Sequence, residues 1–230
     1  MKKFDSVDVF KNSFKILFKN LELMILMLFP VLVFIGCLIF FILKAGRTSP
    51  IIFLAETTTN LASLFPSISS SLILSLILII FMIFIMLFVD AAIILKTHSL
   101  IQRQKTSWQE IFSNAGKRIP KFFISALLVS IFVAAGIFAL IIPGIYLSIK
   151  FALFKPAVVL NKKGFGVAEA WKLSKGNWWG IFIVYLLFTM TSFLLVFIPF
   201  IGVLIQIFLI RPAQNIALTL IYHQLKKPND

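Results

Sequence analysis

Long apolar runs, separated by short polar stretches, dominate this chain. A run of about 18 or more apolar residues predicts a membrane-spanning helix. Six such spans are expected: Leu21–Leu43, Ile68–Leu95, Phe122–Ile142, Ile145–Leu160, Trp178–Ile198 and Ile201–Tyr222. The fourth would make only about 24 Å of helix, less than the usual hydrocarbon thickness. A re-entrant pair over Phe122–Leu160 is therefore the alternative to two full crossings there.

Each pair of spans is preceded by a short stretch with helical apolar spacing. The first carries Val7, Phe10, Phe14, Leu17 and Phe18 among three lysines, and the third has Val167, Ala170, Trp171 and Ser174 on one face and ends at Gly176. Ser107 and Glu110 form a capping box that opens the second stretch. Such amphipathic helices lie in the membrane interface, with lysines towards anionic head groups.

All four tryptophans lie in or beside these stretches: Trp108, Trp171, Trp178 and Trp179. An indole ring favours the interface because its body is apolar while its N–H needs a partner. We therefore expect the four to be interface anchors, with a docking platform for a partner as the alternative.

A repeat links the later spans. Lys155-Pro156-Ala157 recurs at an offset of 56 residues (211 − 155) as Arg211-Pro212-Ala213, and Phe122-Phe123 corresponds to Trp178-Trp179. Val89-Asp90-Ala91 occupies the same place in a more diverged first copy. The prediction is an all-α polytopic bundle, one membrane domain over 1–230, with three repeated hairpins at about 1–98, 99–163 and 164–230 and amphipathic helices on the cytoplasmic side.

The placement of charge sets the expected orientation. The net charge of +14 would suit a nucleic-acid-binding protein, but 17 of the 22 cations flank the spans on one side. Only Lys44 and Arg47 lie on the other. By the positive-inside rule, this predicts six crossings of the cell membrane, both termini in the cytoplasm, and no nucleic-acid partner. A re-entrant fourth segment would place Lys162 and Lys163 outside, which the count disfavours.

Two further features fit this arrangement. The first span is too long for a signal-peptide core and has no Ala-x-Ala site, so we expect an uncleaved helix; it contains the single Cys37, which excludes a disulfide framework. The one substantial outer loop is expected at Lys44–Pro66, and tight outer turns are expected at Pro143-Gly144 and Pro199–Gly202.

Apart from Glu22 at the start of the first span, four charged residues lie inside the expected spans: Asp90, Lys150, Lys155 and Arg211. Each charge at a helix centre costs roughly 2.5–3.5 kcal/mol on insertion scales, so such residues mark functional sites. Lys155 and Arg211 are candidates for holding an anionic head group, with Asp90 pairing to one of them. The alternatives are that the lysines reach out to lipid phosphates while Asp90 neutralises Arg211, or that proline-broken repeats form a transport site.

Catalytic patterns are lacking. His98 and His223 are the only histidines, neither in a metal-ligand spacing, and the eight acids form no carboxylate pair. The expectation is a non-enzymatic membrane protein without metal or cofactor that binds an anionic phospholipid or a membrane protein at the cytoplasmic leaflet. A small-solute or ion-coupled transporter is the alternative.

Three motifs in order, Pro143–Phe151, Pro156–Leu160 and Ala168–Trp179, carry a family resemblance over roughly residues 120–182. This region resembles the membrane domain attached to some glycerophosphoryl diester phosphodiesterases, and related stand-alone, uncharacterised multi-helix membrane proteins of prokaryotes. The resemblance implies an integral membrane protein of about six helices. It implies no phosphodiesterase activity, because the catalytic barrel and its acidic metal ligands have no counterpart in these residues.

Overall fold

A computed structural model describes residues 4–45, 61–161, 164–198 and 200–226. These residues are helical apart from short connections. The helices are α1 (Ser6–Lys19), α2 (Glu22–Ile25), α3 (Leu28–Ala45), α5 (Leu61–Ile101), α6 (Trp108–Ala139), α7 (Ile141–Lys150), α8 (Phe154–Leu160), α9 (Val167–Ser174), α10 (Trp178–Val196), α11 (Ile201–Ile205), η1 (Gln206–Ile210) and α12 (Arg211–Lys226). The chain divides into two compact units, residues 1–27 with 87–230, and residues 28–86.

Among the described residues, six helical segments are long and apolar enough to cross a membrane, so the chain is a multi-pass membrane protein. They are Glu22–Phe40, Ile73–Ile101, Trp108–Ala139, Ile141–Leu160, Trp178–Val196 and Ile201–Lys226. Each coincides with one of the six expected spans, which confirms the all-α class and the number of apolar helices. The expected loop residues 46–60, together with Lys162, Lys163 and Pro199, lie outside the described residues.

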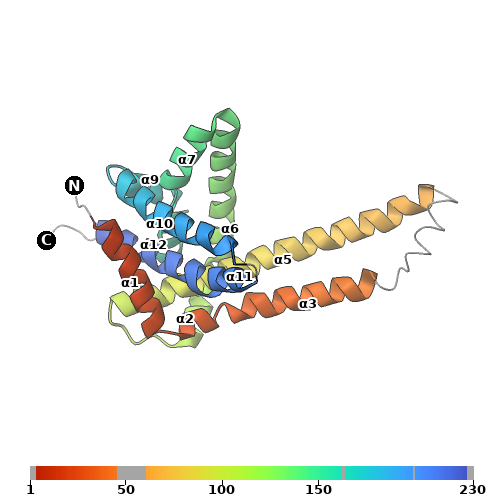
Figure 1. The fold of residues 1–230 in the computed structure, drawn as a ribbon, viewed down its shortest axis with the longest axis horizontal. Coiled ribbons are helices and arrows are strands. Elements are labelled where there is room, and N and C mark those ends of the chain that lie inside the picture. Colours follow the sequence, from red (N-terminus) through yellow and green to blue (C-terminus); the bar gives the residue numbers. More distant parts are fainter. Residues whose placement is uncertain (1–3, 46–60, 162–163, 199, 227–230) are drawn as a thin grey trace. The chain divides into compact units, whose positions relative to one another are not determined.

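In the first unit, α1 begins where Asp5 caps the helix, and it packs on α12 (Figure 1). The Asp5 carboxylate accepts the backbone N–H groups of Val7 and Asp8, which have no partner within the helix. Val9 and Leu17 are buried in the same apolar cluster as Tyr222 of α12. Of the apolar stripe predicted for this stretch, Phe10, Phe14 and Leu17 pack on the bundle, whereas Val7 and Phe18 are exposed. The lysines of α1 are also exposed.

Proline explains the division of the first expected span. The helix breaks at Leu26-Met27, between α2 and α3, and Pro30 follows four residues after Leu26. A proline inside a helix has no N–H, and its ring clashes with the carbonyl four residues earlier. The carbonyl of Leu26 is thus the one that an unbroken helix would bring against Pro30.

The second amphipathic stretch is not a separate helix, contrary to the expectation. It continues into the third span as the single helix α6, with Pro120 inside it. The position equivalent to Pro120 in the next repeat is Gly176, where φ is +87° and the chain does break between α9 and α10. Gly116 precedes Pro120 by one turn, and a Cβ there would meet nothing within 4 Å. Ser107 caps α6 as predicted, accepting the Glu110 N–H.

The reversal between the third and fourth spans lies at Leu140, not at Pro143-Gly144 as predicted. Leu140 is extended (φ −168°, ψ 147°), and Pro143 lies in the first turn of α7, where a helix needs no proline N–H. Gly144 instead lets α7 approach α6: a Cβ there would lie 2.8 Å from the Ile137 backbone nitrogen. In Figure 1, α6 and α7 lie side by side as a hairpin.

The fourth and sixth spans are irregular at equivalent places. The fourth is interrupted at Phe151–Leu153, between α7 and α8, and the sixth passes through the π-helix η1 before α12. Pro156 and Pro212 follow these irregularities directly, and the residues four before them, Ala152 and Phe208, lie within the irregular segments. A proline cannot donate a hydrogen bond to the carbonyl four residues earlier, and its ring crowds that carbonyl. In both repeats the chain departs from regular α-helix at this carbonyl, which relieves the clash.

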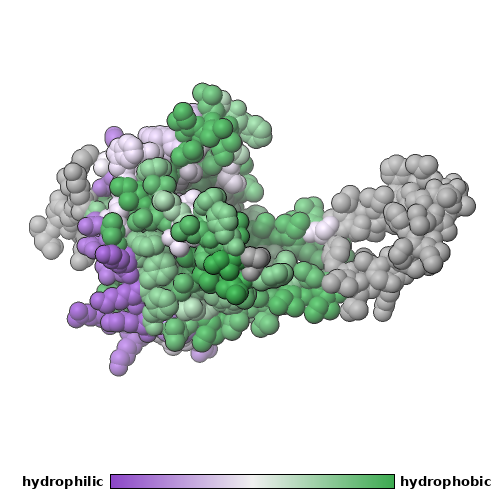
Figure 2. Space-filling model, viewed as in Figure 1, coloured by the Kyte–Doolittle hydropathy of each residue, from purple (hydrophilic) through white to green (hydrophobic). Residues whose placement is uncertain are grey.

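Apolar side chains cover most of the first unit. Figure 2 shows apolar atoms over α6, α7, α10 and α11, whereas hydrophilic atoms gather at the edge formed by α1. The second unit contains α3 and the first part of α5, and exposes large apolar side chains such as Leu32, Phe34 and Ile77. Exposed apolar surface of this extent is the composition of a lipid-facing surface rather than of a water-facing one.

Candidate anion site

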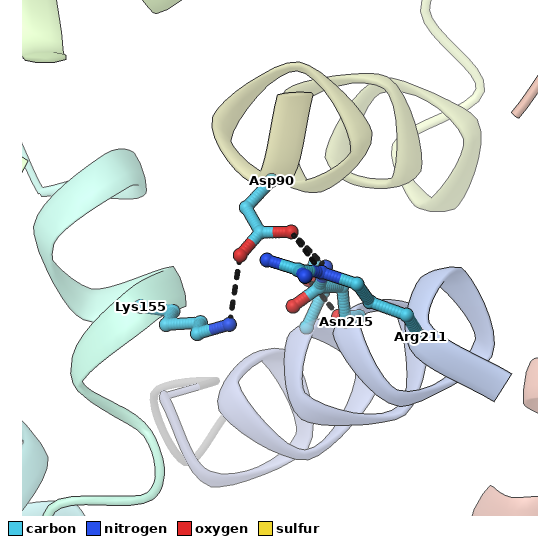
Figure 3. Close-up of polar contacts among 5 residues, drawn as sticks. Asp90, Lys155, Arg211 and Asn215 are labelled. Atoms are coloured by element: carbon cyan, nitrogen blue, oxygen red, sulfur yellow. Dashed lines mark hydrogen bonds and ion pairs between the residues drawn. The ribbon is translucent and has the colours of Figure 1, made fainter. Parts of the chain in front are cut away.

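Asp90 of α5 lies buried between α8 and α12, with 2% of its side chain exposed. Its Oδ2 is 2.8 Å from Nζ of Lys155, and its Oδ1 accepts the Asn215 amide at 2.8 Å. Nε of Arg211 lies 3.5 Å from the same Oδ1. Figure 3 shows the carboxylate pointing from α5 to the three partners. We call these four residues the Asp90 cluster.

The irregular segments of the fourth and sixth spans determine where Lys155 and Arg211 lie. Lys155 lies in the first turn of α8, and Arg211 is the first residue of α12. Pro156 fits there because the first turn of α8 makes no intrahelical use of its missing N–H. Pro212 instead follows η1, where the helix departs from regular α geometry. The repeated cation-Pro-Ala sequence thus puts a cation at equivalent points of two helices, and both cations meet the single acid.

The first repeat supplies the acid on an unbroken helix. No proline lies next to Asp90, and α5 continues regularly through it. Its neighbours Val89, Ala91 and Ala92 are buried. The small alanine side chains let neighbouring helices pack closely around the carboxylate. This packing keeps solvent away from the Asp90 carboxylate.

The Asp90 cluster carries an excess positive charge. Both carboxylate oxygens are engaged by protein donors, while two cations face one acid. The Lys155 side chain remains 28% exposed and that of Arg211 37% exposed. Arg211 approaches the carboxylate through Nε, at 3.5 Å. The arrangement can therefore bind one further anion without displacing Asp90.

Lys150 is placed apart from this cluster. It is 7% exposed, and its ammonium lies over two aromatic rings, 5.5 Å from the Tyr146 centroid and 5.4 Å from that of Trp171. It makes no ion pair with any carboxylate of the described residues. Cation–π contacts, rather than Asp90, stabilise its charge.

The four predicted anchors differ in their surroundings. Trp179 is 69% exposed and Trp171 is also exposed. Trp108 is half-buried and donates its indole N–H to Glu22 at 2.8 Å, with Lys96 over its ring. Trp178 stacks between Tyr146 and Phe182. Trp108 and Trp178 thus join helices of the bundle, and Trp171 and Trp179 present indole rings to the surroundings.

Sequence reasoning did not include Asn215 in the site. The spacing in the sequence could have indicated it, because Asn215 lies one helical turn after Arg211, on the same face of α12. Because the amide donates to the same oxygen as Arg211, it fixes the orientation of the carboxylate rather than its charge.

No family model, curated protein or solved structure matches the chain.

Proposed function

We propose that this protein is a non-enzymatic component of the cell membrane that binds an anionic phospholipid head group at the Asp90 cluster. The observation that carries the proposal is the excess positive charge of that cluster, two partly exposed cations against one buried acid. Arg211 would hold the phosphate through its two Nη groups, and Lys155 would add a point charge. Asp90 and Asn215 keep both cations in place.

The same proposal assigns both termini to the cytoplasm and the cluster to the inner leaflet. Its support is the distribution of 17 flanking cations on one side of the spans against two on the other. Anionic lipids are enriched in the cytoplasmic leaflet, so the ligand and the cations would meet there. The proposal also retains kinship with the membrane domain of glycerophosphoryl diester phosphodiesterases, supported by the motifs of residues 120–182.

Native mass spectrometry of the gently solubilised protein tests lipid binding. The wild type should retain an anionic phospholipid, and Arg211→Leu should lose it. Because Asp90 keeps Lys155 and Asn215, the fold of this variant should be preserved. Lys172→Leu, which removes an exposed lysine of α9 outside the cluster, is the matched control and should retain the lipid.

The contrary result is a purely structural ion pair. If Arg211→Leu misfolds and Asp90→Leu in the same chain restores folding, the cations serve only to neutralise the acid. That outcome follows from the cost of an unpaired buried charge, about 3–5 kcal/mol. Unchanged lipid retention in the Lys155→Leu, Arg211→Leu double variant would exclude the head-group site directly.

A small-solute or ion-coupled transporter is the second candidate. The observation that favours it is the pair of irregular segments, Phe151–Leu153 and η1, at equivalent positions beside the Asp90 cluster. Broken helices at matching places in repeats are typical of transporter binding sites. Flux of a solute or of protons in liposomes, lost in Asp90→Asn, would support transport, and its absence would favour head-group binding alone. A co-purifying protein in the same mass spectra would instead identify a membrane partner.

A further inference from the structure

A second group of basic side chains lies where α5, α6 and α12 have their polar ends. It consists of His98 on α5, Arg118 and Lys121 on α6, and His223 on α12. All four are partly exposed and lie outside the Asp90 cluster. We call them the basic cluster.

The two histidines make a close contact across the bundle. Nδ1 of His98 is 2.5 Å from Nε2 of His223, and the rings stack with centroids 4.6 Å apart. Such a contact holds one hydrogen between the two nitrogens, with one ring donating and the other accepting. If both nitrogens carry a hydrogen, two donors face each other and the contact must open.

Arg118 adds a positive charge without an acid partner. Its Nη1 is fully buried and meets no acceptor among the described residues. Its charge acts on both the His98 ring and Lys121, and Lys226 also acts on His98. A buried donor of this kind is costly unless an acceptor reaches it.

The acid that acts on Lys121 already has partners. Glu169 acts electrostatically on Lys121, but its Oε1 accepts from Tyr222 and Lys226, and its Oε2 from Asn161. Within the described part of the chain, no ion pair joins a carboxylate to Arg118 or Lys121. The acceptor that Arg118 Nη1 lacks is therefore an anion that the described residues do not supply.

We propose that the basic cluster binds a doubly charged oxyanion, of the sulfate or phosphate-ester class, and that binding takes up a proton at the histidine pair. The proton comes from the aqueous phase and adds to a ring nitrogen, so both N–H groups turn to the anion. Arg118 supplies the permanent charge, and Lys121 lies one turn later on the same face of α6. No covalent bond forms or breaks.

Sulfate is the probe, because it stays a dianion across the range in which histidine titrates, whereas a phosphate ester has a second pKa near 6. Calorimetry on the protein in a neutral detergent should show sulfate binding that strengthens about tenfold per pH unit between about pH 8 and 6, as uptake of one proton requires. Arg118→Gln should abolish binding. Lys117→Gln, an exposed neighbour on α6, is the matched control and should leave it unchanged.

The double variant His98→Gln, His223→Gln separates charge from protonation, because it removes both rings that could take up the proton. It should keep sulfate binding through Arg118 and lose the pH dependence. If Arg118→Gln does not fold, Arg118→Lys keeps the charge but loses the guanidinium geometry, and should bind more weakly with the same pH slope. Equal sulfate binding by wild type and Arg118→Gln, or affinity that is constant with pH, would overturn the proposal.

Two sources of the oxyanion are distinguished with nanodiscs. If the natural ligand is a lipid head group, phosphatidic acid nanodiscs should abolish the sulfate binding seen in phosphatidylcholine nanodiscs. If it is a free anion, sulfate should bind equally in both. Arg211→Leu should leave sulfate binding intact, so this site and the Asp90 cluster succeed or fail separately.

Discussion

At the residue scale, Glu169 ties α9 to α12 and to the end of α8. Its carboxylate lies 2.8 Å from Tyr222 Oη and 2.8 Å from Lys226 Nζ, and it also accepts from the amide of Asn161. Burial alone would raise the pKa of Glu169, but the hydrogen bonds from Lys226, Tyr222 and Asn161 outweigh it. The pKa of Glu169 is therefore held below its ordinary value of 4.5.

The lowered pKa of Glu169 determines how the stability of the protein changes with pH. A depressed carboxyl pKa contributes stability that is complete above 4.5 and is lost as the pH falls through the folded-state pKa. Glu169→Gln should thus lower the apparent melting temperature in detergent at pH 7, and the difference from wild type should shrink as the solution is acidified below 4.5. Tyr222→Phe should lose part of the same stability at pH 7. A difference that stays constant with pH would mean that Glu169 contributes packing only.

At the scale of elements, glycine sets the spacing of the α6–α7 hairpin. A Cβ on Gly136 would come within 3.1 Å of the Gly144 Cα, and a Cβ on Gly144 within 2.9 Å of the Ile137 Cα. The two helices are therefore in backbone contact. Helix pairs in membranes associate through small residues of this kind, because lipid offers no hydrophobic driving force between apolar helices.

Gly144→Ala should destabilise this hairpin by about 1–3 kcal/mol, as overpacking does elsewhere. Gly116→Ala in α6 is the matched control, since a Cβ there meets nothing within 4 Å. The control should be neutral or up to about 1 kcal/mol more stable, because alanine is the better helix former. Thermal unfolding of both variants in one detergent makes the comparison. Equal melting temperatures for the two variants would show that α7 can shift away without cost.

At the scale of the whole molecule, topology follows from charge and from the number of spans. The six apolar helices are even in number, which brings both ends of the chain to the same side if every one crosses. The excess of flanking cations assigns that side to the cytoplasm in our proposal. The short fourth span is the critical case, because its two helices, α7 and α8, are both brief.

Cysteine labelling on intact cells tests this topology. After Cys37→Ala, a cysteine at Thr58, a position outside the described residues, should react with an impermeant reagent from outside. Cysteines at Lys105 and Lys175 should react only after permeabilisation. External labelling at Lys175 but not at Lys105 would show that the α7–α8 segment does not cross, and would contradict the six-span proposal.

Hydropathy alone located all six apolar helices, but it misplaced the points where they bend. Pro143-Gly144 looked like a turn because proline and glycine reverse chains, yet Leu140 makes the reversal and Gly144 makes a helix contact. Likewise, the stretch opening at Ser107 joined its span because Pro120 lies inside α6 without ending it. Local composition identifies residues that can break a helix, and the packing around each residue decides which of them do.

The site shows the same division. The sequence by itself determined that Asp90, Lys155 and Arg211 lie in apolar spans, with Lys155 and Arg211 at equivalent repeat positions and Asp90 one position from theirs, since period, cost of burial and proline placement are all local properties. Only the tertiary structure decided that both cations share one carboxylate, that Asn215 joins them, and that Lys150 faces Tyr146 and Trp171 instead. It also brought His98 to His223, 125 residues apart. The physical reason is that a helix fixes which face a side chain occupies, whereas its partner depends on how distant helices pack.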